Sequence, residues 1–336
     1  MAAEPGTIIV LNGVAGAGKT SLARAIQDAA GEPCLDAGID RFLRMLPARY
    51  LEPPLWPDVM GMHDRPGAVG RQLMTAMHQA IAAIARSGMA VVADHVMVER
   101  RWVSECAHLF AALPAYLVGV VAPLEVLEQR ERDRPDRSAT AGEVGRQFSV
   151  VHAHTAYDVE VDTSRLSPAE AAGAVRQHVD RNPPRAFRLL MLFEGAPSFV
   201  RRLLAQASAG SSDELFDLAE RVALELPESQ QIELLDAHPR IGATPATVSA
   251  VSFREQGYDR DAGTPELQAR LDRLNEEYER RYGFRFVVFV AGRSRREIAD
   301  VMESRLGAPR EDEKLRALRD VVAIARDRAR QLESAA

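Results

Sequence analysis

The segment that most constrains the fold of this chain is residues 13–20, which read GVAGAGKT and directly follow a short apolar run at residues 7–11. The pattern is G-x-x-x-x-G-K-[ST], placed after a predicted strand and before a predicted helix, as phosphate-binding loops require. Small residues let successive backbone N–H groups face phosphate oxygens, and the following helix adds the positive end of its dipole. Lys19 would span the phosphates, and the Thr20 hydroxyl can bind Mg²⁺. A glycine-rich turn that matches by accident is the alternative. The motif predicts an ATP site, which we expect Gly13, Gly16, Ala17, Gly18, Lys19, Thr20 and Ser21 to line.

Apolar runs alternate with amphipathic stretches from residue 7 to residue 181, which is the pattern of a parallel α/β sheet. The apolar runs are short and β-branched, as in strands that are covered on both faces. A proline-rich stretch, 51–66, fits neither period, and we expect a loop or flap over a site there. The predicted strands are 7–11, 89–93 and 116–121, and the predicted helices are 21–30, 69–86 and 101–112.

A last helix of this half begins with a capping box at residues 167–170 and ends near Arg181. The sequence Asn-Pro-Pro at 182–184 then breaks the pattern, because proline lacks an N–H donor and restricts the residue before it. At 336 residues the chain is long enough for two hydrophobic cores. We therefore predict a P-loop α/β domain at 1–181, a linker at 182–185 and a second domain at 186–336.

The second half has almost purely helical periodicity, so we predict an all-α domain. A capping box begins one of its helices at residues 294–297. The stretch 284–290 is the exception, because its β-branched and aromatic residues favour an extended conformation. The predicted helices are 197–207, 212–226, 228–237, 265–282, 294–306 and 311–332.

The composition excludes several classes of protein. A formal net charge of -6 and a pI near 5.8 argue against nucleic acid as a partner, because duplex binding needs a basic surface. Only Cys34 and Cys106 occur, so neither a disulfide framework nor a zinc ribbon is expected. The N-terminus lacks the pattern of a signal peptide, and no apolar run reaches the roughly 20 residues of a membrane span. We expect a cytoplasmic protein that does not contact membranes.

Charged residues near the predicted sheet edge extend the ATP hypothesis. Asp94 ends a predicted strand at the carboxyl edge, where it can hold Mg²⁺ through water or, alternatively, cap the next turn. Four arginines follow within eight residues around a proline. Such a run is either a solvated face or, in a P-loop phosphotransferase, a lid that neutralises the transferring phosphoryl group. These arginines are Arg130, Arg132, Arg134 and Arg137, and we expect Arg134 and Arg137 to contact the nucleotide.

Residues 7–180 resemble the chloramphenicol phosphotransferase family of small P-loop kinases. The matching stretches are IIVLNGVAGAGKTS, Gly-Ile-Asp at 38–40, VVADHV at 91–96, the arginine-rich segment and VVHAHTAYDVEVDT at 150–163. The resemblance implies ATP and Mg²⁺ as cofactors. It also implies that Asp40 is the base that accepts a proton from the acceptor hydroxyl, which is sound phosphoryl-transfer chemistry. The family often has a second acidic residue where this chain has His95.

The second half contains candidate groups for acid–base chemistry. His238 ends a predicted helix and is followed by Pro239 and a turn, and its side chain titrates near neutral pH. A lone histidine is more often structural. Ser252, Glu255 and Gln256 lie within about one helical turn of one another and so can share a face. Glu255 near His238 would keep that ring oriented and basic.

Residues 186–332 resemble the 2-oxo-4-hydroxy-4-carboxy-5-ureidoimidazoline (OHCU) decarboxylase family. The matching stretches are FEGAPSFVRRL, AHPRIG, SFREQGYD and LNEEYERRYGFRFVVFVAGRS. The resemblance implies an all-helical, often dimeric fold that removes CO₂ from a urate-derived intermediate without a cofactor and yields S-allantoin. His238 would be the acid–base, with Glu255 beside it. Substrate would contact Ser252, Glu255, Gln256, the backbone of Phe286, Val287 and Val288, and Arg293, two residues beyond Ala291, where the family places a basic residue.

The two resemblances together predict a bifunctional enzyme, a carboxy-lyase joined to an ATP-dependent phosphotransferase of a small-molecule hydroxyl. Two alternatives remain open at this stage. In the first alternative, the P-loop domain binds nucleotide without transferring phosphate and regulates or scaffolds the decarboxylase. In the second, both domains would modify one ureide-type metabolite in two steps. A homodimer through the C-terminal domain is the expected oligomer.

Overall fold

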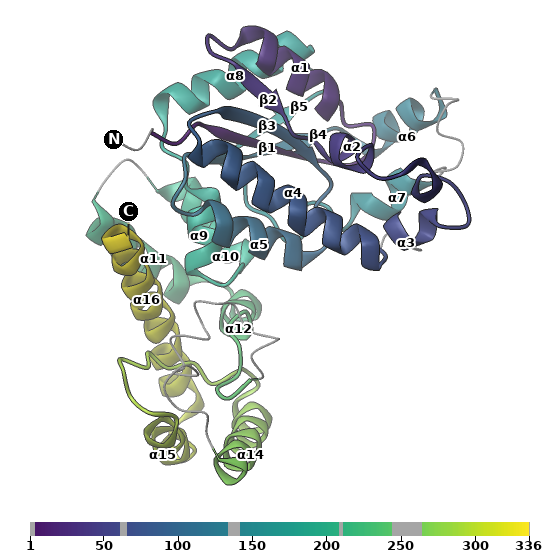
Figure 1. The fold of residues 1–336 in the computed structure, drawn as a ribbon. Coiled ribbons are helices and arrows are strands. Elements are labelled where there is room, and N and C mark those ends of the chain that lie inside the picture. The colour runs from purple at the N-terminus through teal and green to yellow at the C-terminus, as the bar shows by residue number, and fades with distance from the viewer. Residues whose placement is uncertain (1–3, 61–65, 134–141, 208–210, 244–263, 336) are drawn as a thin grey trace. The chain divides into compact units, whose positions relative to one another are not determined.

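The computed structural model describes residues 4–60, 66–133, 142–207, 211–243 and 264–335 (Figure 1). The chain forms two compact units, Met1–Met191 and Leu192–Ala336. Among the described residues, none of the helices combines the length and the apolar character needed to cross a bilayer.

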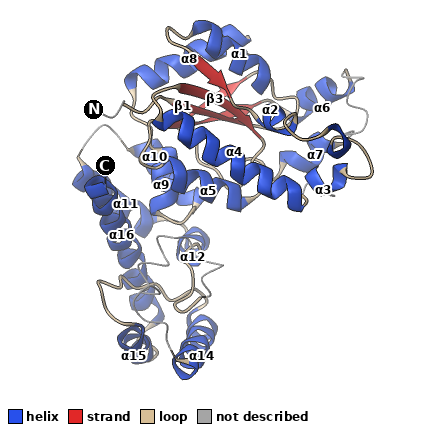
Figure 2. Ribbon diagram, viewed as in Figure 1, coloured by secondary structure: helices blue, strands red, loops and turns tan. Residues whose placement is uncertain are grey.

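The first unit is built on a five-stranded parallel sheet with strand order β2-β3-β1-β4-β5 (Figure 2). The predicted parallel α/β fold is confirmed. The three central strands are the three predicted ones, and their side chains are almost all buried, which explains their uninterrupted apolar character. The two edge strands, β2 and β5, are short and carry charged residues, so neither hydrophobic periodicity nor an apolar composition predicts them. The bounds are β1 Ile8–Asn12, β2 Cys34–Asp36, β3 Ala90–His95, β4 Ala115–Val121 and β5 Val159–Asp162.

Helices cover both faces of this sheet. Helices α1 and α8 pack against each other over one face, and their apolar residues form a core with the central strands, whereas α4 and α5 cover the other face (Figure 1). The predicted capping box is present, since the Ser167 hydroxyl accepts from the Glu170 N–H. The helices are α1 Lys19–Ala29, α2 Ile39–Leu43, α3 Trp56–Met60, α4 Ala68–Arg86, α5 Arg100–Phe110, α6 Leu124–Arg132, α7 Glu143–Phe148 and α8 Pro168–Arg181.

The stretch 51–66 differs in part from the expected loop. It contains the short helix α3, and a 3-10 turn, Ala48–Tyr50, lies just before it. Pro57 is the second residue of α3, a position where the missing N–H breaks no helical hydrogen bond. The proline-rich composition therefore predicted a loop where the structure has a single helical turn. Residues 61–65 lie outside the described part of the chain.

Helix α9, Ala186–Leu192, begins in the first unit. The half-buried carboxylate of Asp158 accepts from the backbone N–H groups of Arg185 (2.8 Å) and Ala186 (2.9 Å), and Phe187 packs edge-on against Phe110 of α5. The division between the compact units thus falls after Met191. The linker at 182–185 remains a prediction from the sequence.

The second unit is all-α, as predicted. A capping box at Ser294 and Glu297 begins α15, also as predicted. The stretch 284–290 contains neither helix nor strand pairing, yet Phe284, Phe286 and Val287 are buried. The helices are α10 Pro197–Gln206, α11 Ser212–Glu225, α12 Glu228–Asp236, α14 Pro265–Tyr282, α15 Arg295–Arg305 and α16 Arg310–Ala335.

Candidate functional sites

The phosphate-binding loop, residues 13–20, connects β1 to α1. Gly16 and Gly18 have φ values of 83° and 86°, which side chains other than glycine rarely adopt. Gly13 lies so close to β4 that a Cβ atom there would be 2.4 Å from the Val120 carbonyl oxygen. The three glycines of the motif are therefore required by the backbone path. This path turns the loop toward the carboxyl edge of the sheet, where ligands of α/β folds bind.

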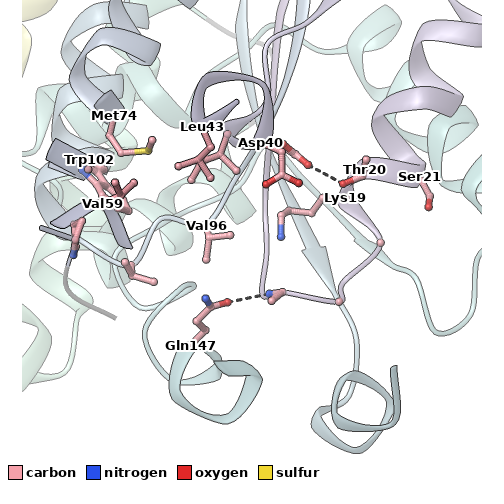
Figure 3. Close-up of a pocket in the computed structure, with 18 residues that line it drawn as sticks. Lys19, Thr20, Ser21, Asp40, Leu43, Val59, Met74, Val96, Trp102 and Gln147 are labelled. Carbon is pink, nitrogen blue, oxygen red and sulfur yellow. Dashed lines mark hydrogen bonds between the residues drawn. The ribbon is translucent and has the colours of Figure 1, made fainter. Parts of the chain in front are cut away.

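The Lys19 ammonium is buried inside this loop. Its Nζ donates to the carbonyl oxygens of Gly13 (2.7 Å) and Val14 (2.9 Å), and its side chain lines the same pocket as Asp40 (Figure 3). A cation fixed at this position can contact the β- and γ-phosphates of a nucleotide. The loop thus combines backbone N–H groups, a helix N-terminus and an ammonium in one place.

Thr20 and Asp94 meet at the ends of neighbouring elements. Asp94 lies beside Leu11 in the register of β3 and β1, and the Thr20 hydroxyl donates to its Oδ2 at 3.0 Å. Burial raises the pKa of Asp94 above its ordinary value, Lys19 and Thr20 lower it, and Asp40 and Asp36 raise it further. A hydroxyl and a carboxylate are oxygen donors that suit Mg²⁺. The described residues contain no cluster of three or more His, Cys, Asp or Glu that could hold a metal, so the remaining ligands would come from phosphates and water.

Asp40 lies in the first turn of α2 and faces the same pocket as Lys19 and Asp94. The polar residues gather on one side of this pocket, and the opposite wall is apolar (Figure 3). The predicted base, the predicted metal ligands and the phosphate-binding lysine are therefore brought together. The apolar wall is formed by Leu43, Val59, Met74, Val96 and Trp102, among others.

Two residues near the loop were not assigned these roles from the sequence. The buried Gln147 of α7 accepts from the Ala15 N–H with its Oε1 at 2.9 Å. Arg130 donates to the carbonyl oxygens of Thr163 (2.7 Å) and Gly16 (3.3 Å), so it connects the loop to the end of β5. A second hollow lies beside it, lined by Gly16, Gly18, Ser21, Arg130, Thr163 and Leu166 among others. Arg134 and Arg137 lie outside the described residues.

A buried histidine pair lies behind the apolar wall. The Nε2 atoms of His78 and His95 are 2.8 Å apart, and His78 Nδ1 is 3.1 Å from Glu105. Burial, and then the neighbouring His78, lower the pKa of His95 well below its ordinary value. His95 also packs against Trp102 of the pocket wall. His95 therefore lies behind the wall, and its lowered pKa favours the neutral ring.

In the second unit, His238 lies just beyond the end of α12 and is buried, with 4% of its surface exposed. Its Nδ1 lies 3.1 Å from the carbonyl oxygen of Leu234. Because a carbonyl only accepts, Nδ1 carries the proton, and the neutral ring has its lone pair on Nε2. The ring is thus held in the tautomer in which Nε2 can accept a proton.

The buried residues Phe286, Val287 and Val288 lie in the irregular stretch 284–290. Arg285 donates to the carbonyl oxygen of His238 at 2.8 Å, which brings this stretch to the end of α12. Two groups of predicted site residues therefore lie together. Ser252, Glu255 and Gln256 lie outside the described residues.

Arg293 is bound to its own turn. Its guanidinium donates to the carbonyl oxygens of Val290 (3.0 Å) and Phe289, across a turn in which Ala291 and Gly292 have φ values of 50° and 78°. This geometry places the cation against residues 289–290. Its role in binding a substrate carboxylate remains a prediction.

Comparisons with known proteins match both halves of the chain. Residues 6–180, more than half of the sequence, match the family model of chloramphenicol phosphotransferase-like proteins, and residues 184–330 match that of OHCU decarboxylases. A Mycobacterium tuberculosis protein with the provisional name O-phosphotransferase is 33% identical over 205 residues, which cover 56% of this chain and 90% of the relative.

Relatives of the second half include OHCU decarboxylases and a uric acid degradation protein. A 2-oxo-4-hydroxy-4-carboxy-5-ureidoimidazoline decarboxylase of Haloferax volcanii is 29% identical over 134 residues, covering 40% of this chain and 80% of the relative. The uric acid degradation bifunctional protein of Bacillus subtilis is 31% identical over 141 residues, covering 41% of this chain and 28% of the relative.

Proposed function

The chain belongs to the chloramphenicol phosphotransferase-like family and carries an OHCU decarboxylase domain after it, and from this premise we propose a bifunctional enzyme. The second unit removes CO₂ from 2-oxo-4-hydroxy-4-carboxy-5-ureidoimidazoline to give S-allantoin. The first unit transfers the γ-phosphoryl group of ATP to a hydroxyl of a small molecule.

The position of His238 is the observation that carries the decarboxylase proposal. Loss of CO₂ leaves an electron pair on the substrate, and a substrate carbon must then be protonated. A single enantiomer forms only if the proton is delivered to one face of that carbon. His238 Nε2 can accept the proton of the substrate hydroxyl and then donate it to the substrate carbon, because hydrogen bonding of Nδ1 to Leu234 leaves the lone pair on Nε2. Glu255 would orient the ring, and Ser252 and Gln256 would bind the ureido group. No cofactor is required in this scheme.

Time-resolved circular dichroism of allantoin formation from freshly generated urate-oxidation intermediate tests this proposal. The wild type should form S-allantoin faster than the spontaneous reaction, and His238→Ala should lose about 100-fold or more of the rate. His178→Asn, in the first unit, is the control and should be unchanged. A wild-type rate equal to the spontaneous one would refute the decarboxylase.

The shared pocket of Lys19, Asp94 and Asp40 supports the phosphotransferase proposal. Lys19 would contact the phosphates, Asp40 would accept the proton of the acceptor hydroxyl, and Thr20 and Asp94 would hold Mg²⁺, which supplies positive charge against the phosphates. Arg134 and Arg137 would close over the nucleotide. The apolar wall suits an acceptor alcohol with an apolar body.

Asp40→Asn separates phosphoryl transfer from nucleotide sensing. ATP binding by calorimetry should stay within about threefold of wild type, whereas ADP formation with chloramphenicol or simple aromatic alcohols as acceptor probes should fall about 100-fold or more. A domain that only regulates or scaffolds the decarboxylase would bind ATP, show no acceptor-dependent ADP formation and tolerate Asp40→Asn. Allantoin as a probe tests whether both units act on one ureide.

The proposal includes a cytoplasmic location, since an ATP-dependent transferase needs the nucleotide pool of the cell interior. It also includes a homodimer formed through the helical unit, as the resemblance to OHCU decarboxylases implies. Light scattering of the full chain tests the oligomeric state, and a monomer at micromolar concentration would refute that part.

A further inference from the structure

Arg285 connects the end of α12 to the irregular stretch 284–290. Its Nη1 donates to the carbonyl oxygens of Asp236 (2.7 Å) and His238 (2.8 Å). Its backbone N–H donates to the Asp236 carboxylate at 2.9 Å. One residue thus makes three hydrogen bonds to a three-residue segment that contains the predicted acid–base histidine.

This connection matters because neither partner is held by regular structure. Residues 285–290 have no strand pairing, so side chains must supply the partners of their buried backbone groups. His238 lies beyond α12, where the last carbonyls of a helix have no partner within it. A guanidinium at this end satisfies two carbonyls and complements the negative end of the helix dipole.

Helix α16 holds the rest of the irregular stretch. Arg316 donates to the Val287 carbonyl at 2.9 Å, and the Phe289 N–H donates to the Asp320 carboxylate. Arg285 adds a direct hydrogen-bonded link from this stretch to the segment that carries the histidine.

We infer that Arg285 is a positioning residue of the decarboxylase, which holds His238 at a fixed distance and angle from the backbone of Phe286–Val288. This inference rests on the proposed decarboxylation and adds a residue to it. A substrate bound along that backbone would then meet Nε2 of His238 from one face only. Loosening the link should slow proton transfer and weaken its facial selectivity, while most contacts to the substrate remain.

The test compares Arg285→Met and Arg285→Lys with wild type in the allantoin assay. Arg285→Met should lower kcat about 10- to 100-fold with KM changed less than about threefold, because small misplacement of a reacting group has effects of this size. It should also lower the enantiomeric excess of S-allantoin. Arg285→Lys should recover most of kcat and of the enantiomeric excess, since an ammonium can donate to both carbonyls. Arg280→Met, on the exposed face of α14, is the matched control and should match wild type.

The outcomes separate the inference from the function on which it rests. An active wild type whose kcat and enantiomeric excess survive Arg285→Met would overturn the positioning role alone. A folded Arg285→Lys with no recovery would also overturn it. If Arg285→Met does not fold, Arg285→Gln replaces it with the same expectation. A wild type that does not accelerate the reaction would overturn the decarboxylase and the inference with it.

Discussion

The two sites of this molecule are held in place by different means. In the first unit, Asp94 and the phosphate-binding loop lie at the ends of adjacent parallel strands, so the backbone ladder between β1 and β3 sets their spacing. In the second unit, His238 and residues 286–288 lie beyond a helix end and in a stretch without strand pairing. Arginine side chains supply the hydrogen bonds that a ladder supplies in the first unit.

This difference determines which substitutions each site tolerates. A ladder of backbone hydrogen bonds does not depend on any one side chain. Removing a half-buried arginine that binds backbone carbonyls and carboxylates takes one hydrogen-bond or ion-pair partner from each of them at once, and each such loss has a cost in stability. The second site should therefore be sensitive to residues that never contact the substrate.

The largest effect should come from Arg316→Met. The guanidinium of Arg316 binds the Val287 carbonyl, pairs with Glu313 (3.1 Å) and Asp320 (2.6 Å) and lies over the Phe286 ring. Because Glu313 is 1% exposed, its charge would lose a buried partner. We expect the second unit to lose about 3–5 kcal/mol of unfolding free energy.

Denaturant unfolding of the full chain measures this loss unit by unit. Both tryptophans, Trp56 and Trp102, belong to the first unit, so their fluorescence should not shift, whereas far-ultraviolet circular dichroism should. Arg316→Met combined with Glu313→Gln should recover part of the loss. If Arg316→Met lost less than about 1 kcal/mol of unfolding free energy, the irregular stretch would not depend on this arginine for its stability.

Lys19→Ala should have the next largest effect, on ligand binding rather than folding. Its ammonium is held within the loop that is predicted to bind the phosphates, so ATP affinity should fall about 100-fold. The sheet should hold the rest of the site, and the fluorescence unfolding midpoint should change little. Arg24→Ala, which removes an exposed cation from the same helix, is the control for net charge. Unchanged ATP affinity in calorimetry would argue that the loop binds something other than a nucleotide.

The same difference explains what the sequence could predict. The loop at 13–20 is formed by contiguous backbone, so one short stretch of sequence predicts its geometry. Amphipathic periodicity placed the longer helices of both units but did not predict the shorter helices α2, α3, α6, α7 and α9. The edge strands β2 and β5 escaped notice because three or four partly charged residues carry no periodic signal.

The supports of both sites could not be predicted in the same way. Gln147 meets Ala15 across 132 positions, Arg285 meets His238 across 47 and Arg316 meets Val287 across 29. Contacts between residues so far apart depend on tertiary packing, which single-sequence patterns do not contain. The contacts of Arg130 with Thr163 and Gly16 were likewise not predicted, and the lid at 130–137 remains a prediction.

Asp94→Asn should have a smaller effect with a characteristic pH dependence. Burial raises the pKa of Asp94 in the folded state above its value in the unfolded chain. As pH rises between these two pKa values, the unfolded chain loses the Asp94 proton while the folded protein keeps it, so the free energy of unfolding falls. Asp94→Asn has no carboxylate to titrate, so this pH-dependent loss of stability disappears in the variant. The variant should therefore gain thermal stability over wild type as pH rises from about 4, with the difference levelling off once the folded carboxylate has ionised. A difference that is constant from pH 4 to pH 7 would contradict the assigned cause, and Mg²⁺-dependent ATP turnover should fall in the same variant.

Arg319→Ala should have the smallest effect and is the sharpest control for the comparison. Arg319 lies three residues after Arg316 on α16 and pairs with Glu220 of α11 at 3.3 Å, but its side chain is 60% exposed. Because water replaces an exposed partner, we expect a loss of less than about 0.5 kcal/mol in the circular dichroism transition. If Arg319→Ala cost as much as Arg316→Met, general charge pairing along α16 would stabilise the unit. If only Arg316→Met caused a large loss of unfolding free energy, the result would show that an arginine stabilises this unit when it binds buried backbone and carboxylate groups.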